Sequence, residues 1–162
     1  RREHHELWTD GSVSLGDKSG AAALLYRNNT LICAPKTGEG GLSCGYRAEC
    51  VALEIGLQRL LKWLPAYRST PSRLSIFSDS LSMLTALQTG PLAVTDPILR
   101  RLWRLLLHVQ RRKLRIRLQF VFGHCGVKRN EVCDEMAKKA ADVGGQNSWE
   151  LGGVEMEFLR II

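Results

Sequence analysis

The order of strand-like and helix-like segments restricts the fold of this chain more than any other feature of its sequence. Three short apolar segments, residues 6–12, 20–27 and 30–35, are separated by turns rich in Gly, Asp and Asn, which predicts three consecutive antiparallel strands. Helical and strand-like patterns alternate after them. Because a strand–helix–strand crossover makes parallel neighbours, this order predicts an α/β fold: a five-stranded mixed sheet, three antiparallel strands and then parallel strands, with helices on both faces.

The later segments are assigned from the spacing of their apolar residues. This spacing predicts helices at 47–64, 80–88, 97–112 and 130–143, and strands at 74–78 and 115–122. Asp96-Pro97 is expected to start the third of these helices, with the proline at its first position. Glycine-rich loops are expected at 38–45 and 144–148. We therefore expect one domain over residues 1–145, followed by a C-terminal tail at 146–162 to which the sequence assigns no role.

The composition is that of a compact, basic protein. The 162 residues are 44% hydrophobic and 24% charged, with a net charge of +7, which excludes a disordered or fibrous chain and favours an anionic partner such as nucleic acid. No apolar run reaches the roughly 18 residues of a membrane helix, so no membrane partner is expected. The five cysteines form no C-x-x-C pair, which is typical of free thiols in an intracellular protein, nuclear or cytoplasmic rather than secreted. The abrupt start at Arg1 indicates a piece of a longer polypeptide.

Two acidic residues belong to predicted strands. Asp10 lies within the first strand, and Asp79 directly follows the strand at 74–78. Each also has a purely structural explanation, because Asp10-Gly11 is a common hairpin turn and Asp79 could cap the helix that follows. The sequence leaves both interpretations open.

Two further acidic residues lie in the first turns of helices. Glu49 would favour the positive end of its helix dipole in any case, and Asp134 could form a surface ion pair with Lys138. Considered together with the strand residues, however, these positions can converge at one edge of a mixed sheet. Several carboxylates at one point require a hard divalent cation, and with a basic surface around them they favour phosphodiester chemistry on two metal ions.

A single histidine, His124, lies in the loop Gly123-His124-Cys125-Gly126 between the last strand and the last helix. A lone histidine is usually structural or solvated, but an imidazole in a glycine-containing loop can also shuttle protons during product departure. A zinc site built from histidines and cysteines is disfavoured, because these residues lack the regular spacing of zinc ligands.

Four short motifs occur in a fixed order: Thr9-Asp10-Gly11-Ser12, Arg47-Ala48-Glu49, Ser78-Asp79-Ser80, and the His124 loop followed by Asn130-Glu131-x-x-Asp134. Together, over residues 6–143, they resemble type 1 ribonuclease H. Within that family, Tyr46-Arg47-Ala48-Glu49 and the Gly-His-Cys-Gly-Val loop are most similar to the ribonuclease H domains of non-LTR retrotransposon polyproteins. The resemblance implies a reverse transcriptase domain in the same chain, and we expect a monomer when the domain is isolated.

The resemblance also implies an activity and a set of site residues. The activity is endonucleolytic hydrolysis of the RNA strand of RNA/DNA hybrids with two Mg²⁺ ions, for which Mn²⁺ can substitute. Asp10 would bridge both ions, and Asp134 would complete the nucleophile side. Glu49 and Asp79 would hold the leaving-group side, and His124 would assist product release. The residues expected to bind substrate are Gly11, Ser12, Tyr46, Arg47, Asn130, Arg111, Arg112 and Lys113.

The sequence departs from cellular members of the family in two places. Gly45 and Tyr46 replace the polar amide residues that contact the minor groove, and residues 90–95 leave no room for an additional basic helix and loop. The basic residues of the helix at 97–112 and its end either replace that protrusion on phosphates or form a solvated surface. They are Arg100, Arg101, Arg104, Arg111, Arg112 and Lys113.

Two other functions are compatible with the same fold. One is a non-catalytic module that binds hybrid or duplex, and the other is a DNA-cutting integrase or transposase. The presence of all four carboxylates disfavours the first. The second typically uses three carboxylates and has no role for the histidine loop.

Overall fold

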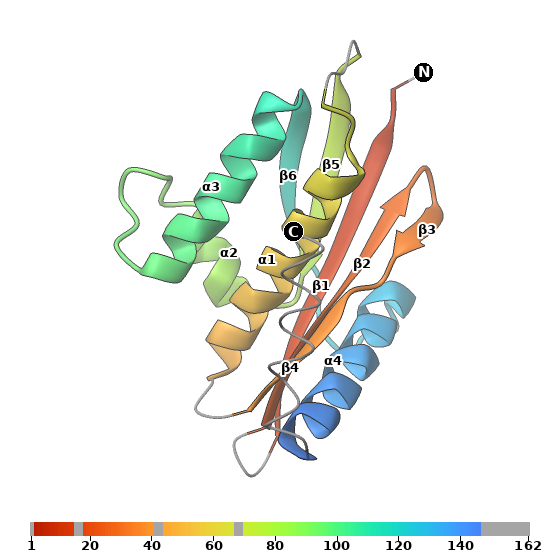
Figure 1. Cartoon of the computed structure of the whole chain (residues 1–162), viewed down its shortest axis with the longest axis vertical. Coiled ribbons are helices and arrows are strands. Elements are labelled where there is room, and N and C mark those ends of the chain that lie inside the picture. The colour runs from red at the N-terminus through yellow and green to blue at the C-terminus, as the bar shows by residue number, and fades with distance from the viewer. Residues whose placement is uncertain (1, 15–17, 41–43, 67–69, 147–162) are drawn as a thin grey trace.

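The computed structural model of this chain describes residues 2–14, 18–40, 44–66 and 70–146. In these ranges the chain forms one mixed sheet with helices on both faces (Figure 1). The strands are β1 (His4–Ser14), β2 (Lys18–Arg27), β3 (Thr30–Cys33), β4 (Lys36–Gly40), β5 (Ser72–Ser78) and β6 (Leu114–Phe120). The helices are α1 (Gly45–Trp63), α2 (Leu81–Leu87), α3 (Pro97–Arg111) and α4 (Lys128–Gln146).

The strand order is β3-β2-β1-β5-β6, with β4 also paired to β2. β1 is antiparallel to β2 and parallel to β5, and β5 is parallel to β6. This confirms the predicted α/β class and the predicted change from antiparallel to parallel pairing. The parallel strands β1 and β5 lie side by side in the middle of the sheet, so their carboxyl ends meet at one point.

The sheet has six strands and not the predicted five, because its outer strand is in two pieces. β3 pairs with the second half of β2 and β4 with the first half. Pro35 lies between the two pieces and has no N–H for the ladder, although its carbonyl accepts a hydrogen bond from the N–H of Ala23 at 2.9 Å. The predicted strand at 30–35 and the predicted loop at 38–45 therefore both have wrong boundaries.

Two apolar clusters hold the helices to the two faces of the sheet. On one face, α1 packs on β1, β2 and α3, and the buried leucines of these elements form the main core. On the other face, α4 packs on β1, β2 and β4 through a smaller cluster around Trp8, Leu24 and Cys133. The Cys133 thiol donates to the carbonyls of Trp8 and Ala22 at 3.5 and 3.2 Å, which fixes α4 against the central strands.

Other sequence predictions can be compared at single residues. Asp96 caps α3, as predicted, by accepting a hydrogen bond from the N–H of Ile98 at 3.0 Å. The strand predicted at 115–122 ends earlier, at Phe120, and Phe122 beyond it is 69% exposed rather than part of the apolar side. All five cysteines are free. Within the described ranges, no helix combines the length and apolarity needed to span a bilayer.

Candidate active site

The centre of the site is formed by the carboxyl ends of β1 and β5. The parallel pairing of these strands ends at Trp8 and Phe77. Asp10 and Asp79 each lie two residues beyond that last pair, so their side chains leave the same face of the sheet where the two strands separate. β1 continues through Asp10 and Gly11 to Ser14, which makes the hairpin-turn interpretation of Asp10 wrong.

The second structural alternative, in which Asp79 caps α2, is also not what the chain does. The cap of α2 is Ser80, whose hydroxyl accepts a hydrogen bond from the N–H of Met83 at 3.4 Å. The Ser80 N–H in turn donates to the Ser78 hydroxyl at 3.0 Å. The turn is therefore completed by serines, and the Asp79 carboxylate is available to the cluster.

Helix α1 adds Glu49 to this pair because its first turn touches β1. A Cβ atom at Gly11 would lie 2.4 Å from the carbonyl carbon of Ala48, so only glycine permits this approach. The backbone of Gly11 in turn lies close enough to Glu49 to favour the charged form of its carboxyl group, and Glu49 is only 8% exposed. One carboxylate oxygen from each of Asp10, Glu49 and Asp79 lies within 4.8 Å of the others.

Helix α4 brings Asp134 to the opposite side of Asp10. The Asp134 carboxylate shares a hydrogen bond with Asp10, and its Oδ2 atom accepts from Lys138 Nζ at 2.8 Å. The ion pair expected on helical spacing is therefore present, and the same carboxylate also reaches the cluster. Asp10 is in contact with both Glu49 and Asp134, which makes it the central acid of the site.

The protonation of the cluster is set by burial and by its own charges. Burial, and next the charge of Glu49, raise the pKa of Asp10 to about 11. Burial also raises the pKa of Glu49 to about 7, although hydrogen bonds from Asp10 and Gly11 favour its charged form. For Asp134, burial raises the pKa, but hydrogen bonds from Lys138 and Asp10 outweigh it and the pKa is lowered.

The carboxylate oxygens of the cluster are suitable ligands for a divalent cation. Asp10 Oδ2 and Glu49 Oε2 are buried and have no hydrogen-bond partner among the described residues. Buried carboxylate oxygens without donors are costly unless a proton or a cation satisfies them. Oxygen ligands from three or four carboxylates are those preferred by Mg²⁺ and Mn²⁺.

The loop that carries His124 lies against Asp79. A Cβ atom at Gly123 would be 2.8 Å from Asp79 Oδ2, so the loop backbone borders the carboxylate directly. His124 is exposed, has a positive φ of 58°, and is close enough to Asp134 to favour its charged form. The imidazole therefore lies at the rim of the site and not among the buried acids.

The other predicted substrate residues belong to the elements that carry the carboxylates, and they differ in exposure. Gly11 and Ser12 continue β1 beyond Asp10, and Arg47 is exposed in the first turn of α1. Tyr46 is half-buried against the main core, and burial raises its pKa to about 12. Asn130 is only 3% exposed.

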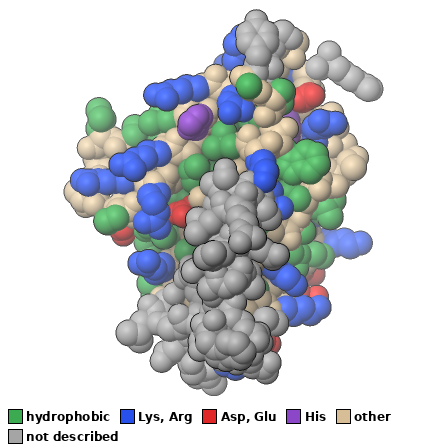
Figure 2. Space-filling model, viewed as in Figure 1, with side chains coloured by type: hydrophobic (Ala, Val, Ile, Leu, Met, Phe, Trp, Pro, Cys, Tyr) green, Lys and Arg blue, Asp and Glu red, His purple; other side chains and the backbone are tan. Residues whose placement is uncertain are grey.

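The structure does not bring Arg111, Arg112 and Lys113 to the cluster. They follow α3 at the end of the sheet where β6 begins, whereas Asp79 follows the other end of the neighbouring β5 (Figure 1). The Arg112 guanidinium donates to the carbonyls of Leu64 and Pro65, both at 3.2 Å, and so closes the end of α1. Lysine and arginine side chains are numerous on the face of the molecule that Figure 2 shows, which is viewed as in Figure 1.

Sequence reasoning did not assign a role to three exposed arginines on the strands next to Asp79. They are Arg73 on β5 and Arg115 and Arg117 on β6. The alternation of apolar and basic residues in 115–122 was the available signal.

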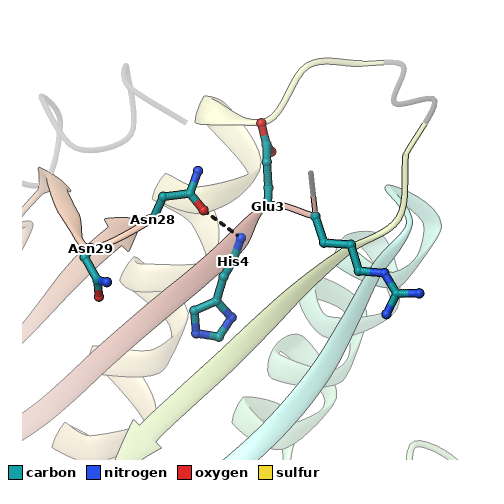
Figure 3. Close-up of a pocket in the computed structure, with 5 residues that line it drawn as sticks. Glu3, His4, Asn28 and Asn29 are labelled. Carbon is teal, nitrogen blue, oxygen red and sulfur yellow. Dashed lines mark hydrogen bonds between the residues drawn. The ribbon is translucent and has the colours of Figure 1, made fainter.

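A pocket that the sequence also did not indicate is lined by Arg2, Glu3, His4, Asn28 and Asn29 (Figure 3). It lies at the start of β1, six residues and roughly 20 Å from Asp10, outside the carboxylate site.

A mixed sheet whose central parallel strands end in a cluster of buried and half-buried carboxylates fits a nuclease. The family model described as RNase H matches residues 2–142. This chain belongs to the RNase H family, and its class of activity is that of a ribonuclease H.

Individual relatives agree with this membership. A protein named Ribonuclease H from Syntrophomonas wolfei subsp. wolfei is 27% identical in an alignment 147 residues long, which covers 83% of this chain and 93% of the relative. The N-terminal RNase H domain of a Mycobacterium tuberculosis protein, solved as a fusion with maltose-binding protein, superimposes with a TM-score of 0.66. That comparison covers 90% of this chain and 98% of the other at 22% identity, and it shows a shared fold.

Proposed function

We propose that this chain hydrolyses the RNA strand of RNA/DNA hybrids with two divalent metal ions, for which Mg²⁺ is the first candidate. The observation that carries the proposal is the group of Asp10, Glu49 and Asp79, with buried oxygens that lack hydrogen-bond donors. Membership in the RNase H family supports a hybrid as the substrate. Bound ions would activate the attacking water and neutralise charge on the leaving oxygen.

The chain's own residues divide the site into two halves. Asp10 contacts acids on both sides and is therefore the residue suited to bridge two ions. Asp134 forms one half, where Lys138 holds it in the charged state. Glu49 and Asp79 form the other half, in which the Gly11 backbone favours the charged form of Glu49.

We assign His124 to product release. Its exposure and its place at the rim allow the imidazole to reach the solvent side of the cleaved phosphate. Gly123 keeps the loop in contact with Asp79, so the histidine stays near the reacting group without entering the buried cluster. Replacement of His124 by Ala should lower multiple-turnover rates more than the single-turnover rate. Equal losses in both would contradict this role.

The test of the main proposal is a cleavage assay with end-labelled RNA/DNA hybrid, duplex RNA and duplex DNA, each with Mg²⁺ or with a chelator. We expect cleavage of the hybrid alone, and only with metal. Asp79→Asn should reduce the rate by about 100-fold or more, since a metal ligand contributes several kcal/mol to the transition state. Glu135→Gln, an exposed acid beside Asp134, is the control and should cut normally. A folded protein that binds hybrid without cutting it would instead be a non-catalytic binding module.

We also propose that the chain is the RNase H domain of a retrotransposon polyprotein and acts beside a reverse transcriptase inside the cell. The support is the Tyr46-Arg47-Ala48-Glu49 motif and the Gly-His-Cys-Gly-Val loop. The reading frame that encodes the chain should then also encode a reverse transcriptase, and a separate frame would contradict this. The glycine-rich loop predicted at 144–148 starts too early, because α4 continues to Gln146. The predicted domain boundary after residue 145 can be tested by limited proteolysis, which should cut beyond α4 and leave the preceding part intact; residues 147–162 lie outside the described ranges.

A further inference from the structure

The described helices cover one face of the sheet only in part. On the α4 side, α4 packs on β1, β2 and β4. Along β5 and β6 the side chains that point to this side alternate with buried ones and reach solvent. Three of them, which we call the sheet-face arginines, are exposed: Arg73, Arg115 and Arg117.

The sheet-face arginines are held close together by the strand register. Arg73 is paired in register with Arg115, and Arg117 is paired with Ser75 one step further along the same face. Neighbouring strands lie about 4.8 Å apart, so like charges at these positions repel each other. The sheet thus holds three guanidinium groups close together, and a bound anion would relieve the electrostatic repulsion between them.

Within the described ranges, no acidic residue forms an ion pair with the sheet-face arginines. Arg117 donates only to Gln119 Oε1, at 3.2 Å. On the same face of the sheet, the acid nearest in register is Glu6 on β1, opposite Ser75. Glu6 is already paired with Arg129, and it accepts a further hydrogen bond from Trp8 Nε1 at 3.1 Å. The positive charge of this face is therefore uncompensated.

The face leads to the carboxylate cluster. Every second residue of β5 lies on this side of the strand, and the same alternation continues to the residue that follows it: Arg73, Ser75, Phe77 and Asp79. The six residue steps from Arg73 to Asp79 span roughly 20 Å, which corresponds to about six phosphates of one strand at about 3.4 Å each. Guanidinium groups on a rigid sheet suit phosphate oxygens, which they bind in pairs of hydrogen bonds.

We infer that the sheet-face arginines bind phosphates of the RNA/DNA hybrid away from the scissile bond. The identity of the polyanion rests on the proposed function, whereas the presence of a polyanion site rests on the uncompensated charge. The residues expected from sequence to contact phosphate, at the end of α3, lie at the same end of the sheet as Arg73 and Arg115. They belong to the other face, however, because α3 packs together with α1. Substrate phosphates would thus be held on the α4 side of β5 and β6.

The experiment measures hybrid binding by fluorescence anisotropy in a chelator, at salt concentrations from about 50 to 300 mM. The test variant is Arg73→Ala/Arg115→Ala/Arg117→Ala. The control variant, Arg27→Ala/Lys36→Ala/Lys62→Ala, removes the same charge from exposed positions on β2, β4 and α1. We expect the test variant to lower the slope of log affinity against log salt by about 2 to 3, because each phosphate contact contributes roughly 0.9. The control should lower it by less than about 1.

Each outcome is decisive. If the wild type cuts hybrid and the two variants show the same slope, the inference is wrong and the proposed function stands. If the wild type binds hybrid but does not cut it, the proposed function fails and the slopes still decide the inference. Binding of polyglutamate in preference to hybrid would assign the face to an acidic protein and overturn the inference. Thermal melting checks folding, and the test variant should melt at or above the wild-type temperature because repulsion is removed.

Discussion

Trp8 and Phe77 stack face to face beneath the carboxylates, with ring centroids 4.1 Å apart and ring planes 6° from parallel. They are the last paired residues of β1 and β5. Because Asp10 and Asp79 follow them by two positions on the same face, the stacked rings set the separation from which both carboxylates project. The apolar pair thus determines a distance in the polar site.

Replacement of Phe77 by Ala should therefore affect stability and activity together. Loss of a stacked ring packed against the α4 cluster should cost about 2–4 kcal/mol of unfolding free energy. The matched control is Phe122→Ala, whose ring is 69% exposed and packs edge-on against Phe120, so that its loss should cost no more than about 1.5 kcal/mol. Urea unfolding measures both. Equal stability of the two variants would show that the stack does not organise the strand ends.

Gly11 should not tolerate a methyl group. In Gly11→Ala the new Cβ would lie 2.4 Å from the Ala48 carbonyl carbon, so α1 must move away from β1 and take Glu49 with it. We expect a loss of about 1–3 kcal/mol and a marked loss of hybrid cleavage. Gly45→Ala is the control, because a Cβ at Gly45 has no neighbour within 4 Å. A fully active Gly11→Ala protein would refute the close helix–strand contact.

The metal-free protein should lose stability as pH rises. The pKa values of Asp10 and Glu49 are raised in the folded state from 3.8 to about 11 and from 4.5 to about 7. Above about pH 4.5 the unfolded chain releases these protons while the folded chain keeps them, so folding is favoured at low pH and its advantage declines as pH rises. In chelator, the free energy of unfolding should thus be lower at pH 8 than at pH 5 by on the order of a few kcal/mol. Urea unfolding measures this difference as a lower transition midpoint at pH 8.

Two additions sharpen this pH test. Asp10→Asn should flatten the dependence, because an amide needs no proton in the buried site. Mg²⁺ should stabilise the wild type more at pH 8 than at pH 5, since Glu49 has then already released its proton and the metal displaces the proton of Asp10 more easily. A wild-type protein equally stable at both pH values in chelator would show that the acids are not buried together.

Arg112→Ala should destabilise the fold without changing how the protein binds hybrid. Its guanidinium donates to two carbonyls at the end of α1, and loss of these bonds should cost about 1–3 kcal/mol. Anisotropy titrations at several salt concentrations should give the wild-type slope. A reduced slope would return Arg112 to the phosphate-contacting role expected from the sequence.

The class of fold and the order of the motifs could be predicted from the sequence because they depend on local patterns. The period of apolar residues distinguishes strand from helix, and a crossover helix requires parallel strands. The cap at Asp96 was equally local. Each of these features is determined by residues within a few positions of one another.

Features that depend on distant partners could not be predicted in the same way. Whether Asp79 caps α2 or joins the cluster was decided by Ser80, which competes for the same helix end. The role of Arg112 depends on Leu64, 48 positions away, whose carbonyl it reaches only when α1 and α3 are packed together. The charge alternation of Arg115 and Arg117 was visible in the sequence, but it was not visible that none of the described helices covers them on the α4 side.

The division of the outer strand at Pro35 affects what this protein does in a concentrated solution. An uninterrupted outer strand presents a row of free backbone groups on which a second chain can extend the sheet. Here Pro35 interrupts that row between β3 and β4. At the other edge, β6 carries Arg115 and Arg117, charges that oppose the approach of another strand. Both edges of the sheet are therefore protected against self-association into aggregates.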